Sequence, residues 1–143
     1  TPEIESASWQ HGKEIFFGEQ AGCYKCHTIR GEGGKIGADL SNLIYRDYAS
    51  VFKDITEPSA AINPDHIAYN VQLTDGEVET GVLLENSQEE IVLGQVTSKS
   101  LKIPRAKVAN MKASAISLMP EGLLKGLTEQ QQHDLLRFLL TVQ

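Results

Sequence analysis

The chain carries its only two cysteines three positions apart, and a histidine follows the second one directly. Cys23, Cys26 and His27 stand in the segment "CYKCH". Two thiols at this spacing, with an imidazole beside them, restrict what can sit at the centre of a chain of 143 residues. Such residues form a redox disulfide, contribute to a metal or cluster site, or attach and ligate a haem.

The sequence lacks the further residues that three of these sites need. A thioredoxin-like C-x-x-C site belongs to a strand–helix unit, whereas the segment before Ala21 has a helical pattern. A zinc site needs two more ligands, and an iron–sulfur cluster needs four thiolates. Covalent haem c uses both thiols as thioethers and the histidine as an iron ligand. The motif therefore predicts one haem c, attached through Cys23 and Cys26 and ligated by His27.

Composition limits the class of protein and its partners. The length fits one domain, and the low aromatic content of 6% suits a core that a bound cofactor helps to fill. Lys and Arg total 13 against 19 Asp and Glu, so the formal net charge of −6 argues against nucleic acid as a partner. The chain has no apolar run of about 18 residues, and its start, "TPEIESASWQ", does not resemble a secretion signal. We expect a mature or excised domain without a membrane span, whose export signal has been removed or lies upstream.

Met119 is the candidate for a second iron ligand. It stands in "SLMPEGL", directly before Pro120, and proline keeps the preceding backbone extended. A thioether in such a loop is free to point at a metal instead of lying on a helix surface. Core packing is the ordinary role of methionine, but together with the C-x-x-C-H motif we expect Met119 to ligate iron.

The other methionine and three histidines are weaker candidates for this position. Met111 lacks the loop and the proline, so packing is its expected role. His11 and His133 have polar neighbours in segments with helical patterns, which indicates solvated faces. His66 follows Pro64 at the edge of an apolar strand and remains the rival sixth ligand.

Two helices are expected near the ends of the chain. The first places Trp9, Gly12 and Phe16 on one face, and the glycine would permit a close crossing of the second helix. The second begins after Thr128 with a capping box and carries an apolar stripe. The stripe consists of Leu135, Phe138, Leu139 and Val142.

Residues 67–108 have a different pattern, which predicts an inserted antiparallel β element. Apolar residues alternate on both sides of Asp75-Gly76, a dipeptide typical of a two-residue hairpin turn. Two more short strands, "EIVLGQV" and "SLKIP", follow turns, so we expect a meander of about four strands. One buried face would cover a side of the haem, and a docking surface for a partner domain is the alternative role.

In this order, the segments resemble a class I cytochrome c. More narrowly, they resemble a haem-binding domain found at the C-terminal end of large multidomain bacterial proteins described as membrane-bound dehydrogenases. The resemblance covers nearly the whole chain. The segments that carry it are "HGKEIFFGEQ", "CYKCH", "GEGGKIGADLSNL", "ITEPSAAINPDHIAY", the "DG" hairpin with "GVLLE", and "SLMPEGL" followed by "LT".

The resemblance implies a mostly α fold, in which residues 1–143 form one cytochrome c domain with the β element inserted before the methionine loop. It implies that Cys23 and Cys26 attach the haem, that His27 is the proximal ligand and that Met119 is the distal one. In class I cytochromes a proline carbonyl in the following loop accepts the ring N–H of the proximal histidine. Here Ala38 stands at that position, so the loop lacks the φ restriction of proline.

Two further groups of residues bear on the expected haem. The glycines of "GEGGKIG" match no phosphate-binding pattern, and we expect them to let the backbone approach the flat haem edge. Trp9 and the tyrosines are candidates for hydrogen bonds to the haem propionates, with core or surface packing as their default role. The tyrosines are Tyr24, Tyr45, Tyr48 and Tyr69.

These features predict an electron carrier, not an enzyme. With His27 and Met119 on the two axial positions, a low-spin haem would shuttle single electrons and act on no substrate. The resemblance implies a dehydrogenase domain as electron donor, another cytochrome or an oxidase as acceptor, and a periplasmic or otherwise exported location. Three alternatives stay open: a haem-based sensor or peroxidase with a labile sixth site, a thiol–disulfide oxidoreductase, and a purely structural haem domain.

Overall fold

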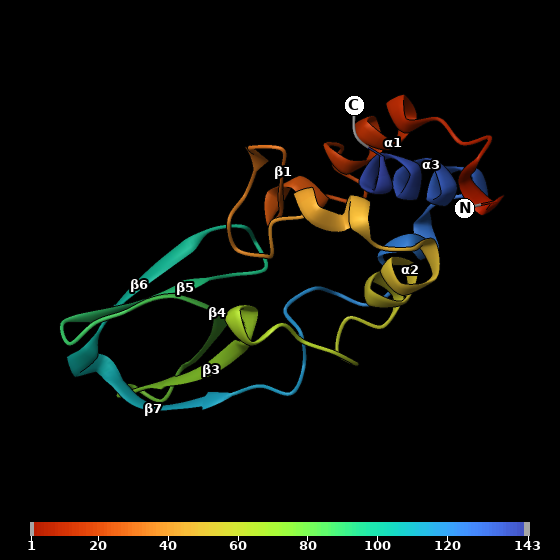
Figure 1. The fold of residues 1–143 in the computed structure, drawn as a ribbon. Coiled ribbons are helices and arrows are strands. Elements are labelled where there is room, and N and C mark those ends of the chain that lie inside the picture. The colour runs from red at the N-terminus through yellow and green to blue at the C-terminus, as the bar shows by residue number, and fades with distance from the viewer. Residues whose placement is uncertain (1, 142–143) are drawn as a thin grey trace.

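The computed structural model describes residues 2–141 and places the α-helices at one end of the molecule and a large sheet at the other (Figure 1). The chain is 35% helical and 25% strand. The expected mostly α fold is therefore wrong, and the protein has a mixed α and β structure. The physical reason lies in residues 68–113, which pair as the five strands of one antiparallel sheet.

Two α-helices from opposite ends of the sequence pack against each other. They are α1 (Trp9–Phe16) and α3 (Glu129–Leu140), and they lie side by side in Figure 1. Gly12 is buried at their crossing, where a Cβ atom would overlap the Asp134 backbone carbonyl and the Phe138 side chain. The missing side chain lets the two backbones approach closely, which is the role that the sequence predicted for this glycine.

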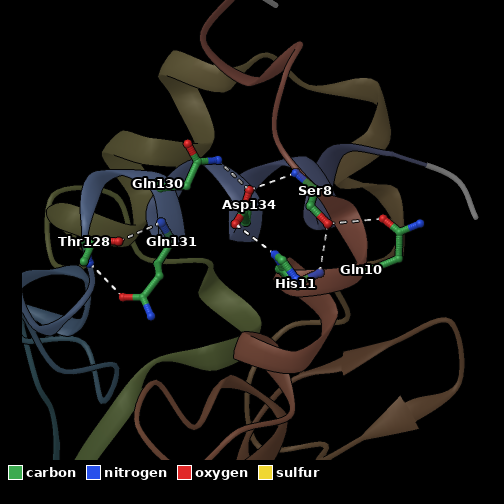
Figure 2. Close-up of polar contacts among 7 residues, drawn as sticks. All are labelled: Ser8, Gln10, His11, Thr128, Gln130, Gln131 and Asp134. Atoms are coloured by element: carbon green, nitrogen blue, oxygen red, sulfur yellow. Dashed lines mark hydrogen bonds and ion pairs between the residues drawn. The ribbon is translucent and has the colours of Figure 1, made fainter.

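Side-chain caps fix the first turn of both helices (Figure 2). Ser8 accepts a hydrogen bond from the His11 amide, and Thr128 and Gln131 form the predicted reciprocal capping box. Three members of the predicted apolar stripe, Leu135, Phe138 and Leu139, are buried. Val142 lies outside the described residues.

Asp134 links the two helices by polar contacts (Figure 2). Its side chain is buried, and Oδ1 accepts hydrogen bonds from the Ser8 amide at 2.8 Å and from the Gln130 side chain at 2.9 Å. His11 Nδ1 lies 3.8 Å from Oδ2. The carboxylate therefore caps the beginning of α1 from the neighbouring helix.

The remaining elements at this end are short. One α-helix, α2 (Tyr48–Thr56), follows a side-chain cap at Asp47, and a two-stranded ribbon follows the cysteine motif. The ribbon strands are β1 (Thr28–Ile29) and β2 (Glu32–Gly33). The 3₁₀ turns are Pro2–Ile4, Cys23–Lys25, Ser41–Tyr45, Pro64–His66, Arg105–Lys107 and Leu123–Gly126. Buried residues from α1, α2, α3 and β1 form one core at this end: Phe16, Ile29, Val51, Leu135, Leu136, Phe138 and Leu139 among others.

The second region is an antiparallel five-stranded sheet with the order β6-β5-β4-β3-β7. The predicted hairpin turn at Asp75-Gly76 joins β3 and β4, and Gly76 has a φ of 92°. The strands are β3 (Ala68–Leu73), β4 (Val78–Asn86), β5 (Glu90–Gly94), β6 (Ser100–Pro104) and β7 (Val108–Ala113).

The fifth strand, β7, was not predicted. It pairs with β3 and extends the β element to Ala113, beyond the expected end at residue 108. Buried and exposed side chains do not alternate along β7, because it is an edge strand and four of its six residues are exposed. Pairing with a strand some forty residues earlier, instead of a local pattern, determines this strand.

The sheet has a core of its own. The buried side chains Val71, Ile91, Leu93 and Ile103 pack together, and Met111 contacts them from β7, the packing role that its context predicted. No helix within residues 2–141 is both long and apolar enough to cross a bilayer.

Candidate functional site

A cavity of about 540 Å³ lies where the helices, the methionine loop and one end of the sheet meet. Cys23, Cys26, His27 and Met119 all line it, although the methionine is far from the other three in sequence. The volume is in the range of pockets that hold small molecules and cofactors. The fold therefore brings the four predicted site residues to a single cavity.

The cysteine motif forms one 3₁₀ turn. The turn begins after Gly22, whose φ of 64° is left-handed, and the His27 amide donates to the Cys23 carbonyl at 2.9 Å. This geometry gathers both thiols and the imidazole on the cavity wall. Neither cysteine takes part in a disulfide.

Both thiols are held in the protonated form. Burial raises the pKa of Cys23 to about 11, and burial also raises the pKa of Cys26. A thiol that attacks disulfides or acts as a nucleophile has a lowered pKa instead, because the thiolate is the reactive species. The surroundings of these cysteines therefore do not favour a thioredoxin-like role.

His27 is oriented by the backbone carbonyl of the following loop. Its Nδ1 lies 2.7 Å from the Ala38 oxygen, so this hydrogen bond is present although alanine replaces the proline of class I cytochromes. The pKa of His27 is lowered, mainly because the ring is buried. A neutral ring that donates from Nδ1 keeps its lone pair on Nε2, the state that a metal ligand requires.

The glycines after the motif allow their loop to pack closely on it, and their approach to a haem edge stays a prediction. A Cβ on Gly37 would lie 2.5 Å from Cε1 of His27 and 3.0 Å from Nε2, and a Cβ on Gly34 would overlap the Lys25 carbonyl. The loop thus packs directly on the motif and on the ring of His27. Gly37 also donates its amide to the Cys26 carbonyl at 2.7 Å.

Three hydrogen bonds fix the loop that carries Met119. Ser114 donates its amide to the Ala68 carbonyl at 2.8 Å, and the Ser117 amide donates to Ser59 Oγ at 3.0 Å. Met119 then donates its own amide to Ser117 Oγ at 3.1 Å. The half-buried methionine is thereby held at the cavity wall, while Pro120 at the next position is exposed.

The other histidines separate into one that lines the cavity and two that do not. His66 lines it, and its Nδ1 is buried without a hydrogen-bond partner among the described residues. His11 is exposed beside Asp134, and His133 lies 4.0 Å from Glu129 on α3. Of the three histidines, only His66, the rival ligand in the sequence analysis, therefore lines the cavity.

Sequence reasoning missed charged and apolar residues of the cavity wall. Arg46 and Asp54 line it and form an ion pair of 2.7 Å, and neither belongs to a recognisable motif. From the β region, Val82 and Val96 also reach the cavity. Tertiary contacts bring these residues to the cavity wall, so no local sequence pattern predicts their position.

The proposed propionate partners do not line this cavity. Tyr24 donates to Glu19 at 2.5 Å, Tyr45 is exposed, and Tyr48 stacks on Phe52. Trp9 packs against the helical core and Tyr69 against the sheet core. Within the described residues, the basic side chains that line the cavity are Lys25 and Arg46, together with the two histidines.

Comparison with protein-family models and with curated proteins finds no match for this chain. Within residues 2–141, no three His, Cys, Asp or Glu side chains gather in a cluster that could hold a metal ion by themselves. The chemistry of the cavity therefore has to be argued from its own donor set. That set comprises two protonated thiols, a neutral imidazole with one free nitrogen, and a thioether.

Proposed function

We propose that this chain is an electron-transfer domain that carries one covalently attached haem c. The observation that supports the proposal is the cavity in which Cys23, Cys26, His27 and Met119 come together. Two thiols, one imidazole and one thioether are the complete protein contribution to a His/Met haem c. The residues present therefore fit this group.

Each side chain has a defined role in this proposal. Cys23 and Cys26 would hold the haem as thioethers, formed when each S–H adds across a vinyl group. His27 and Met119 would supply the two axial ligands. The Ala38 carbonyl would keep the imidazole in the ligating tautomer, and Gly37 leaves room for its ring.

When bound, the haem supplies a one-electron couple at its iron. The chain contributes a low-dielectric wall, because the cavity lining includes Phe16, Val51 and Leu135, which are buried. A thioether ligand and exclusion of water both favour the reduced form, so a higher potential than that of a bis-histidine haem is expected. Because His27 and Met119 would both hold the iron, no substrate would need to bind, and a redox protein would be the partner.

The proposed partners and location follow from the proposed haem c and from the resemblance to haem domains of dehydrogenase-like proteins. A dehydrogenase domain would supply electrons, and a second cytochrome or an oxidase would accept them. Because haem c is attached outside the cytoplasm, the domain would work in the periplasm or another exported compartment.

The test is to express the chain in a periplasm that contains a haem c attachment system. We expect the intact mass to increase by one haem per chain and the ferric spectrum to show the weak far-red band of sulfur-to-iron charge transfer. The Cys23→Ala/Cys26→Ala variant is the matched control and should carry no covalent haem. The Met119→Ala variant should carry haem but lose the far-red band.

Two outcomes would contradict the proposal. A colourless protein with two free thiols would favour the thiol–disulfide alternative. A coloured protein without the far-red band, whose ferrous form binds carbon monoxide rapidly, would favour the sensor or peroxidase with an open sixth site.

A further inference from the structure

His66 also lines the cavity and can ligate a metal, and the proposed function does not use it. It ends the 3₁₀ turn Pro64–His66, which Asn63 caps by accepting from the Asp65 amide at 2.9 Å. The His66 side chain is half-buried, and Nδ1 is shielded from solvent with no hydrogen-bond partner among the described residues. Buried polar atoms of native proteins are normally paired, so an unpaired imidazole nitrogen at a cavity needs an explanation.

The His66 turn is tied to the Met119 loop on both sides. Before the turn, Ser59 accepts from the Ser117 amide, and after it, the Ala68 carbonyl accepts from Ser114. The two segments thus run together over the stretch in which both reach the cavity. His66 therefore shares the wall of the cavity with the methionine loop.

His27 and His66 line the same cavity. Two imidazoles that line a common cavity, each with one ring nitrogen free of protein partners, are the donor set of a bis-histidine site.

We propose that His66 is a second, alternative axial ligand, which binds the haem iron through Nδ1 when the Met119 thioether is withdrawn. This inference rests on the proposed function. The exchange breaks one bond, from the methionine sulfur to iron, and forms one bond, from the histidine nitrogen to iron. No electron or proton is transferred if the His66 proton resides on Nε2. The site then has two ligation states, and the imidazole state has the lower potential, because nitrogen favours ferric iron more than sulfur does.

The experiment compares haem-loaded variants of the whole chain. In Met119→Ala we expect His66 to take the vacant position, so the ferric haem stays low-spin by optical and electron paramagnetic resonance spectra and its potential falls. Met119→Ala/His66→Ala should become high-spin, and its ferrous form should bind carbon monoxide at least about tenfold faster than that of the single variant. Met119→Ala/His133→Ala is the matched control, because His133 lies outside the cavity, and should behave like Met119→Ala.

The inference is overturned if Met119→Ala is already high-spin and binds carbon monoxide as fast as the double variant. Met119→Leu, which conserves volume, serves as a second parent for the same comparison if the alanine variant does not fold. Failure of the proposed function looks different, since it appears in the unmodified chain as absence of covalent haem or of the far-red band. A parent with covalent haem and that band, combined with a high-spin Met119→Ala, refutes the role of His66 alone.

Discussion

The two ends of the molecule build their cores in different ways. In the sheet, Val71, Ile91, Leu93 and Ile103 fill the interior with side chains of their own. At the helical end, several buried residues line a cavity of about 540 Å³ that the methionine loop and one end of the sheet complete. Side chains that face a cavity lose contact partners on one side, so the helical end is the part whose stability depends on what fills it.

The sheet core therefore contributes mainly to stability, whereas the residues proposed to bind the haem lie around the cavity. The residues that carry the proposed chemistry lie on the cysteine motif and the methionine loop, and the sheet reaches the cavity through Val82 and Val96. A change deep in the sheet should therefore alter stability without altering the site. A change in the helices should affect both, because their packing shapes the cavity.

The largest expected effect comes from opening a cavity in the sheet. Leu93 is fully buried in the sheet core, so Leu93→Ala should lower the free energy of unfolding by about 4 kcal/mol. Hydrogen exchange should accelerate in β4, β5 and β6, whereas the far-red band of the haem-loaded protein should remain.

Lys102→Ala provides the control for this change, since Lys102 is exposed on β6 and pairs with Val92 of β5. It should leave stability within about 0.5 kcal/mol of the parent. Loss of the far-red band in Leu93→Ala would show that the sheet core also positions the iron ligands, and the contrast between the two ends would fail.

The next effect concerns the crossing of α1 and α3. In Gly12→Ala the new methyl group would overlap the Asp134 carbonyl, which is backbone and cannot rotate away. We expect a loss of about 3 kcal/mol in thermal or denaturant unfolding, at the upper end of overpacking. Carbon monoxide binding to the ferrous protein should also become faster, because the helices that shape the cavity wall move apart.

Gly126→Ala is the matched control at the same end. Gly126 is exposed, and the nearest atom to an added Cβ, at 3.1 Å, is the end of the flexible Gln20 side chain. Equal destabilisation by both substitutions would mean that close backbone approach at Gly12 is not what holds the helices together.

The smallest expected effect is a pH dependence of the stability of the haem-free chain, which reports on the burial of Cys23 at the cavity. The pKa of Cys23 is raised from its ordinary value of 9.0 to about 11 in the folded chain. Between these values the unfolded chain has lost a proton that the folded chain keeps, so the free energy of unfolding falls as pH rises. The loss should reach about 2 kcal/mol near pH 11, measured by urea unfolding at several pH values.

Cys23→Ala removes the titrating thiol and should flatten this part of the pH profile. An unchanged slope in the variant would show that the helical end does not enclose Cys23 when the haem is absent. The comparison between a hollow helical end and a filled sheet would then apply only to the haem-loaded protein.

Features of the fold that depend on near neighbours could be predicted from the sequence. The capping box at Thr128, the hairpin at Asp75-Gly76 and the close helix crossing at Gly12 are all present. Each is decided by residues within a few positions or by the lack of a side chain. The mostly α fold that the resemblance implied is wrong because residues 68–113 form five strands, one of which, β7, is determined by pairing with a distant strand.

The candidate site divides in the same way. The donor types were readable from "CYKCH" and from methionine before proline, because chemistry is a property of single residues and short motifs. The resemblance drew attention to Ala38 but did not predict its hydrogen bond to His27, because the geometry depends on how a whole loop returns to the ring. No sequence pattern indicated the Arg46–Asp54 ion pair on the cavity wall.

By itself, then, the sequence determined the donors, the caps and the tight turns, since these follow from side-chain chemistry and local backbone preference. Only the tertiary structure decided that β7 pairs with β3, that Met119 shares a cavity with the cysteine motif, and that His66 has an unpaired nitrogen there. These contacts join segments far apart in the chain. They depend on the packing of the whole molecule, which no short stretch of sequence encodes.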